Sequence, residues 1–255
     1  GDGSALTGVA STENIRTNTN ATFLQNVNVG VAITAGKLGI GFTDTNVKVG
    51  STALDSLTTG TLNTAVGTNA LTANTAGAGN VAIGYEALTG NTTANNNTAL
   101  GYRSLYTNST GASNTALGLE SLKLNTTGSS NTAVGENALE ANTSADENTA
   151  VGHDALTANT TGTMNTSVGS LALDANTTGN YNTAVGRSAL SSNTTASDNT
   201  AVGVSALKDN VTGTANSSFG RAALQNNTAN NNTAMGYVAL TANTTGANNT
   251  AVGAN

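Results

Sequence analysis

The stretch that decides the fold is residues 148–164, NTAVGHDALTANTTGTM, because its pattern recurs along most of the chain. The shared pattern is N-T-A-V-G-x-x-A-L-x-x-N-T-T-G-x-x, and its positions are numbered one to seventeen below. A fixed period of this kind identifies a repeat protein in which each unit packs on its neighbours. The first position is held by Asn63, Asn80, Asn97, Asn114, Asn131, Asn148, Asn165, Asn182, Asn199, Asn216, Asn232 and Asn249.

The repeat unit is short and interrupted by glycine, which favours strands over helices. Seventeen residues are too few for two packed helices, and the fifth-position Gly and the N-T-T-G stretch would break a helix in every unit. We expect N-T-A-V-G to be a short strand, x-A-L a second extended piece and N-T-T-G a turn. The predicted fold class is all-β, a parallel β-solenoid (β-roll) of twelve 17-residue coils over residues 63–255, with the last coil partial.

Composition argues against both an ordinary enzyme core and disorder. Of 255 residues, 9% are charged and 3% aromatic, with no Pro, Trp or Cys, and much of the 37% hydrophobic fraction is Ala. Large apolar side chains supply most of the free energy of burial, so a conventional globular core is not expected. The 39 Asn and 47 Thr would suit a disordered polar tract, but the strict period argues against that alternative.

Charge and hydropathy exclude further classes of protein. The net charge is −6 with only eight Lys and Arg, so no basic stripe is available for a phosphate backbone and we expect no nucleic-acid binding. The longest apolar stretch, residues 29–42, is interrupted by Lys37 and several glycines, and it falls short of the ~20 residues of a membrane helix. We therefore expect no membrane span.

The alternation of a β-strand assigns the strand positions to two faces. Positions two and four share one side, and positions three and five share the other. Because Val81 and Ile83 are apolar while Ala82 and Gly84 are small, we expect the Val/Ile side and the ninth-position Leu to form the interior. The predicted core includes Val66, Leu71, Ile83, Leu88, Leu100, Leu105, Val134, Leu139, Val151, Leu156, Val185 and Leu190.

Asparagine recurs at the first and twelfth positions, and stacking would place each column in line. Identical residues of neighbouring coils lie about 4.8 Å apart, so their amides are expected to form hydrogen-bonded ladders. Each ladder bond contributes about 0.5–1.5 kcal/mol, repeated in every coil. The columns include Asn63, Asn80 and Asn131 at the first position and Asn74, Asn91 and Asn142 at the twelfth.

Small residues at the third and fifth positions suggest close approach of another backbone. On this interpretation several chains pack along their small-residue faces as a homo-oligomer, with a homotrimer the expected state. The alternative is that the fifth-position Gly only supplies a positive φ in a turn. Both interpretations remain open at the level of the sequence.

The segment Asn80-Val81-Ala82-Ile83-Gly84, with variants such as residues 131–135, resembles the S-V-A-I-G core of the head repeats of trimeric autotransporter adhesins. The resemblance covers residues 63–255 and implies a left-handed parallel β-roll, three chains side by side and a role in attachment to surfaces. The family's head repeats are usually shorter than seventeen residues. We expect neither a membrane-anchor segment nor a heptad stalk within residues 1–255.

Residues 1–62 are expected to be a separate, β-rich N-terminal module with strands at 21–27, 29–34 and 37–42. The opening GDGSALTGVASTENI, residues 1–15, resembles segments of tail-fibre and other virion structural proteins of marine bacteriophages, especially cyanophages. The resemblance implies a viral fibre at the virion surface or in the extracellular space. Its partners would be other virion or cell-surface structural proteins and a host glycan or receptor.

Candidate catalytic groups are few. Glu120 and Asp154 share the seventh position two coils apart, and Glu136 and His153 share the sixth position of adjacent coils, where stacking would bring them within ~5 Å. Because other coils carry unrelated residues at these positions, we interpret them as exposed and variable, and we expect no enzyme activity, cofactor or metal site. The densest acidic spot, residues 146–147, is interpreted as a solvated turn rather than a calcium site.

The predicted function is a non-enzymatic shaft of a fibre or adhesin, and contacts to a target are expected at variable positions. Tyr85, Tyr102 and Tyr237 occupy the sixth position and are candidates for stacking on sugar rings, with half-buried packing as the alternative. A bacterial surface adhesin or an ice-binding β-solenoid are the alternative functions. Thr columns at the second, thirteenth and fourteenth positions resemble the arrays of ice-binding proteins, but we expect the second-position column to point inward.

Overall fold

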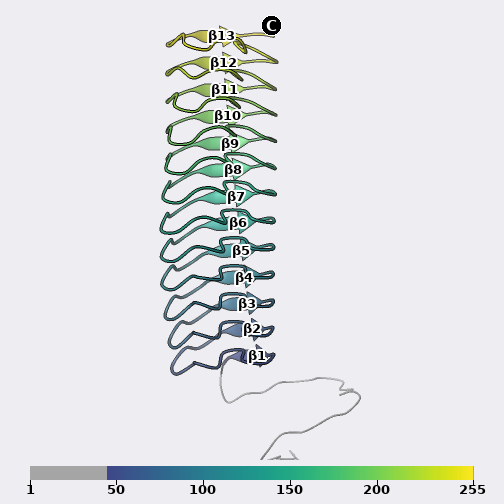
Figure 1. Cartoon of the computed structure of the whole chain (residues 1–255), viewed down its shortest axis with the longest axis vertical. Coiled ribbons are helices and arrows are strands. Elements are labelled where there is room, and N and C mark those ends of the chain that lie inside the picture. The colour runs from purple at the N-terminus through teal and green to yellow at the C-terminus, as the bar shows by residue number, and fades with distance from the viewer. Residues whose placement is uncertain (1–44, 255) are drawn as a thin grey trace, which may run out of the picture. The chain divides into compact units, whose positions relative to one another are not determined.

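A computed structural model describes residues 45–254, which form an all-β parallel solenoid. One three-residue strand from each coil joins a single 13-stranded sheet, and Figure 1 shows the strands stacked in chain order. The strands are β1 (Val47–Val49), β2 (Thr64–Val66), β3 (Val81–Ile83), β4 (Thr98–Leu100), β5 (Thr115–Leu117), β6 (Thr132–Val134), β7 (Thr149–Val151), β8 (Thr166–Val168), β9 (Thr183–Val185), β10 (Thr200–Val202), β11 (Ser217–Phe219), β12 (Thr233–Met235) and β13 (Thr250–Val252).

Neighbouring coils are held in register around their whole circumference. Each strand pairs in parallel with the next, and each residue faces the same position of the following repeat. Hydrogen bonding between coils continues outside the sheet, since the Leu139 amide donates to the Ala155 carbonyl (3.1 Å) and the Thr143 amide to the Thr160 carbonyl (3.1 Å). The backbone polar groups of each coil are therefore largely satisfied by the coils next to it.

The solenoid begins one coil earlier than the sequence repeat predicted. Residues 46–62 form a coil, because β1 pairs in parallel with β2 and Asn46 occupies the first position. Lys48 stands where other coils have a small residue, which disguised this unit in the sequence. The boundary predicted after residue 62 is thus too late, and the strands predicted at 21–27, 29–34 and 37–42 lie outside the described residues.

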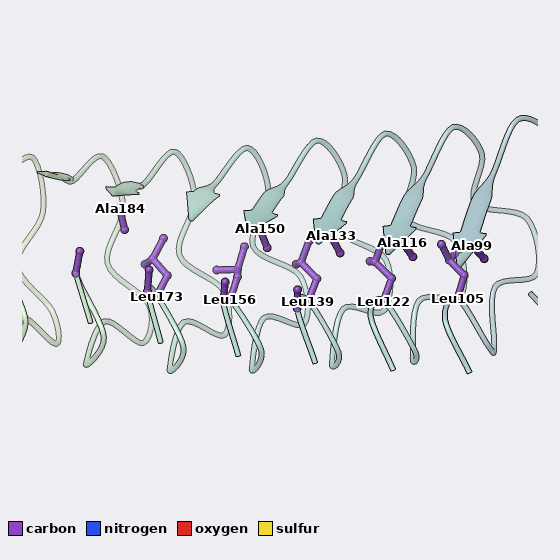
Figure 2. Close-up of a cluster of buried hydrophobic side chains, with 14 of the residues drawn as sticks. Ala99, Leu105, Ala116, Leu122, Ala133, Leu139, Ala150, Leu156, Leu173 and Ala184 are labelled. Atoms are coloured by element: carbon purple, nitrogen blue, oxygen red, sulfur yellow. The ribbon is translucent and has the colours of Figure 1, made fainter. Parts of the chain in front are cut away.

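The interior is built from the opposite strand face to the one predicted. The third-position residue is buried in every coil from Ala65 to Ala234, and it faces the ninth-position Leu, which is fully buried from Leu71 to Leu224. Figure 2 shows these alanines on the strands pointing toward the leucines of the opposite wall. The predicted core residues of the ninth position are buried: Leu71, Leu88, Leu105, Leu139, Leu156 and Leu190. The predicted core residues of the fourth position instead lie on the outer face: Val66, Ile83, Leu100, Val134, Val151 and Val185.

The narrow cross-section of the coil explains this inversion. Behind the sheet, the ninth-position Leu and the eighth-position Ala or Ser of successive coils are buried against the third-position side chain, and the two Asn columns are buried as well. Interiors are packed close to the density of organic crystals, so adding methyl groups at the third position would overfill the coil. Where Ser167 and Ser218 replace Ala in this column, their hydroxyls donate to the carbonyls of Ala172 and Ala223, both at 2.7 Å.

The segment after the strand is a tight turn and not the extended piece that the sequence suggested. The seventh and ninth positions have positive φ angles, for example 54° at Asn137 and 53° at Leu139. Such angles are unusual for leucine, and they fold the chain so that the Leu side chain points into the coil. The same conformation recurs in successive coils, so it belongs to the repeat and is not a local defect.

The fifth-position glycine both adopts a positive φ and allows another backbone to approach closely. Gly135 has a φ of 132°, and a Cβ at this position would lie 2.5 Å from the carbonyl oxygen of Gly152. The close approach is to the next coil of the same chain. The prediction that small-residue faces pack between chains is therefore wrong, because those faces are used inside the solenoid.

Candidate functional site

The first-position asparagines form a continuous internal ladder. The Asn131 amide N–H and Nδ2 both donate to Oδ1 of Asn114 (2.9 and 3.2 Å), and Nδ2 also donates to the Ala145 carbonyl (2.8 Å). Asn148 in turn donates its backbone N–H to Oδ1 of Asn131 at 3.0 Å. The predicted first-position residues Asn63, Asn80 and Asn131 all lie in this ladder and are buried.

The twelfth-position asparagines form a second ladder inside the coil. Asn142 Nδ2 donates to Asn125 Oδ1 at 2.8 Å and to the Ala145 carbonyl of its own turn at 3.1 Å. Equivalent bonds join each coil from Asn74 to Asn193 without interruption. The predicted residues Asn74, Asn91 and Asn142 belong to this ladder, so both columns serve cohesion between coils and are closed to a ligand.

The second ladder breaks at one place. Asn193 Oδ1 is buried with no partner, and Asn210 bonds only within its own turn, to Gly213. At this coil Val211 replaces the usual thirteenth-position Thr, and the following repeat is one residue short. The ladder resumes when Asn243 donates to Asn227 (2.7 Å). The sequence signal for the break was the shortened repeat, whose structural effect was not predicted.

The outer face of the sheet carries Thr at most second positions and Val, Ile or Leu at most fourth positions. The prediction that the second-position column points inward is wrong, since Thr98 and Thr115 are exposed. Within residues 45–254 these second-position hydroxyls form no hydrogen bond with the protein, whereas the thirteenth-position Thr143 donates to the Thr160 carbonyl (3.1 Å). The sheet therefore presents free hydroxyls beside exposed apolar side chains along its length.

A cluster of aromatic and charged side chains interrupts this regularity on two consecutive coils. The rings of Tyr85 and Tyr102 are stacked, with centroids 5.5 Å apart and planes 13° from parallel. The Arg103 guanidinium lies over the rings of Tyr102 and Tyr106, 5.1 and 5.4 Å from their centroids. Arg103 Nε also donates to Glu86 Oε2 at 2.7 Å. We call Tyr85, Glu86, Tyr102, Arg103 and Tyr106 the tyrosine cluster.

The ionisable groups of the tyrosine cluster affect one another. The hydrogen bond from Arg103 lowers the pKa of the Glu86 carboxyl below its ordinary value and raises the pKa of Arg103. The Glu86 carboxylate raises the pKa of the Tyr85 hydroxyl through side-chain hydrogen bonding and its negative charge. Glu86 and Arg103 are therefore an ion pair at neutral pH, and the tyrosine is uncharged.

The third predicted tyrosine stands apart from this cluster. Tyr237 is exposed, and its hydroxyl accepts a hydrogen bond from Arg221 Nη1 at 3.0 Å. The Arg221 guanidinium also lies over the Tyr237 ring, 5.6 Å from its centroid. Tyr237 thus has an arginine partner but no stacked second ring among the described residues, and the structure brings only Tyr85 and Tyr102 together.

Among residues 45–254, no hydrogen bond or ion pair joins the members of either candidate catalytic pair. His153 Nδ1 lies 3.0 Å from Oδ2 of the adjacent Asp154, and the expected approach of His153 to Glu136 produces no ion pair in the described part of the chain. Glu120 instead pairs with Lys123, at 2.8 Å. Among residues 45–254 no three His, Cys, Asp or Glu gather as a metal site requires, and no helix is long and apolar enough to span a bilayer.

The resemblances to adhesin head repeats and to phage fibre proteins rest on the quoted sequence motifs alone. Comparisons with protein-family models, with curated proteins and with solved structures give no match for this chain.

Proposed function

We propose that this chain is the non-enzymatic shaft of a fibre, a rigid spacer that holds other parts of an assembly apart. The observation that carries the proposal is the unbroken stack of thirteen strands, joined by backbone bonds and two Asn ladders. At about 4.8 Å per step the stack is about 58 Å long. The recurring backbone groups and the two Asn columns join coil to coil, which suits mechanical cohesion better than chemistry.

The setting we propose is a tail fibre or other fibre of a virion, or an adhesin, acting at a virion surface or in the extracellular space during host attachment. The support is the likeness of the opening residues to phage fibre proteins and of the N-V-A-I-G segment to adhesin heads. Partners would be other structural proteins of the particle or cell surface. Few charges and a polar, Thr-rich exterior agree with an exposed spacer.

We further propose that the shaft is a homo-oligomer, a trimer by the resemblance, joined through the outer face of the sheet. The support is the column of exposed fourth-position side chains, including Leu117, Val168 and Phe219. Monomeric soluble proteins rarely expose a continuous apolar stripe of this length, so association of copies would remove it from water. This face replaces the small-residue face that the sequence first suggested.

The decisive experiment is light scattering of the full chain together with electron microscopy of negatively stained particles. The expected result is a mass of three chains and straight rods at least as long as the stack. Val168→Glu with Val185→Glu should lower the mass to one chain without loss of β-structure, because a trimer would bury both carboxylates. The control, Thr178→Glu in an exposed turn, should leave the mass unchanged. A monomeric parent chain would overturn the oligomer, and compact particles would overturn the shaft.

A second candidate function is ice binding, and one observation favours it. The second-position Thr hydroxyls point outward, in register and free of protein hydrogen bonds, and so offer water a regular array beside apolar side chains. Thermal hysteresis of the purified chain tests this candidate. Measurable hysteresis that falls after Thr132→Tyr and Thr149→Tyr would support ice binding, and no hysteresis in the parent chain would dismiss it.

A further inference from the structure

We infer that the tyrosine cluster is a binding site for a neutral pyranose sugar on the side of the shaft. The inference goes beyond the spacer function, because a spacer needs no aromatic stack or guanidinium at its surface. It is carried by three features of the cluster: exposed ring surface, a positioned hydrogen-bond donor group and cancelled charge.

The exposed ring surface is the first feature. Tyr85 and Tyr102 are each more than two-fifths exposed even though they stack on one another. In the sixth-position column, Leu119 comes after Tyr102 and the small Thr68 comes before Tyr85. A short side chain beside Tyr85 leaves space next to its ring, where the apolar C–H face of a pyranose can pack.

The donor group is the second feature. Arg103 is fixed by two rings and by the bond from its Nε to Glu86, so little side-chain entropy remains to be lost when a ligand binds. The remaining guanidinium N–H groups make no hydrogen bond within the described residues. A planar fork of free donors suits two neighbouring hydroxyl oxygens, and the Glu86 carboxylate is an acceptor beside it.

The cancelled charge is the third feature, and it selects the class of sugar. Glu86 and Arg103 neutralise each other, and Lys123 is already engaged by the carboxylates of Glu120 and Glu140. An anionic sugar would have to compete with Glu86 for the guanidinium, in a chain whose net charge is −6. Neutral hexoses and N-acetylhexosamines meet no such opposition.

The experiment measures binding of the full chain to immobilised oligosaccharides of glucose, galactose, mannose and N-acetylglucosamine, with a polyuronate as the acidic comparison. We expect at least one neutral glycan to bind, and Tyr85→Ala with Tyr102→Ala to weaken that binding by about tenfold or more. Arg103→Met should also weaken it. Tyr237→Ala is the matched control, because this tyrosine has an arginine partner but no stacked ring, and it should leave binding unchanged.

The outcomes separate this site from the shaft itself. Microscopy and light scattering of each variant report whether rods still form, so a loss of binding with intact rods is attributable to the cluster. The inference fails if the parent chain binds none of the neutral glycans, if it binds only the polyuronate, or if the double tyrosine variant binds as well as the parent. None of these results would change the proposal of a structural shaft.

Discussion

Asn125 lies in the middle of the second ladder, and its replacement by Ala tests how far that ladder stabilises the stack. Asn125 Nδ2 donates to Asn108 Oδ1 (2.8 Å) and to the Gly128 carbonyl (2.9 Å), and its Oδ1 accepts from Asn142 (2.8 Å). Asn125→Ala leaves Asn108 Oδ1 buried without a partner. The Gly128 carbonyl keeps a second donor, Asn114 Nδ2.

The magnitude follows from these three bonds. An orphaned buried acceptor costs about 1–3 kcal/mol, and each of the other two lost bonds costs about 0.5–1.5 kcal/mol. Asn125→Ala should therefore lower the free energy of unfolding by about 2–6 kcal/mol. Part of that loss belongs to the bond with Asn108, so Asn108→Ala and Asn125→Ala should cost less together than the sum of their separate effects, by about 1 kcal/mol or more.

The break in the ladder provides a matched control for this double-mutant cycle. Asn193 and Asn210 occupy the same twelfth position in adjacent coils and are equally buried, but no hydrogen bond joins their side chains. Their coupling should fall below ~0.5 kcal/mol. Urea unfolding followed by circular dichroism gives the free energies, and hydrogen exchange locates the coils that are weakened. Equal coupling in the two pairs would refute the claim that the side-chain ladder binds coil to coil.

Two further substitutions test other features of the coil. Gly135→Ala combines a positive φ with a clash against Gly152, so it should lower the free energy of unfolding by more than the ~1–3 kcal/mol of backbone strain alone. Gly253→Ala has a similar φ of 136° but open space around it, so it should cost only the strain. Thermal melts that rank the two variants equally would contradict the close approach. Asp174 Oδ1 is buried without a partner, and burial raises the pKa of this carboxyl. Asp174→Thr should stabilise the chain by about 0.5–1.5 kcal/mol at pH 7, because tenth-position threonines such as Thr72 donate to the preceding coil. Since the folded state holds the Asp174 proton more tightly than the unfolded state, parent stability falls as pH rises above ~4 towards the raised pKa, and the variant's advantage should grow over that range; an advantage that shrinks with pH would contradict the assignment.

The solenoid and its Asn ladders could be predicted because they depend on periodicity alone. A pattern that repeats every seventeen residues places Asn125 next to Asn108 and Asn142 whatever the shape of the coil. The coil at residues 46–62 escaped detection because it keeps the spacing but departs from the N-T-A-V-G consensus at Lys48. Spacing was thus a better guide than residue identity at the edge of the array.

The direction in which each strand faces could not be predicted from hydropathy. Val134 is more hydrophobic than Ala133, yet Ala133 is buried and Val134 lies outside, because the third-position side chain faces the buried Leu139 and the fourth-position side chain faces away from it. The positive φ of Leu139 that turns its side chain inward has no signal in the sequence, since leucine rarely adopts it. For the candidate site, the column shared by Tyr85 and Tyr102 was predictable, but the position of Arg103 over the rings of Tyr102 and Tyr106 was not.

The repeat of residues 216–231 is one residue short, yet β11 and β12 still pair residue for residue. The turn thus accommodates the missing residue, and the strands stay aligned. Unequal exchange between copies of the repeat would lengthen or shorten the rod in increments of about 4.8 Å. The length of the rod could then change during evolution by whole coils, because each added coil brings the same core residues as its neighbours.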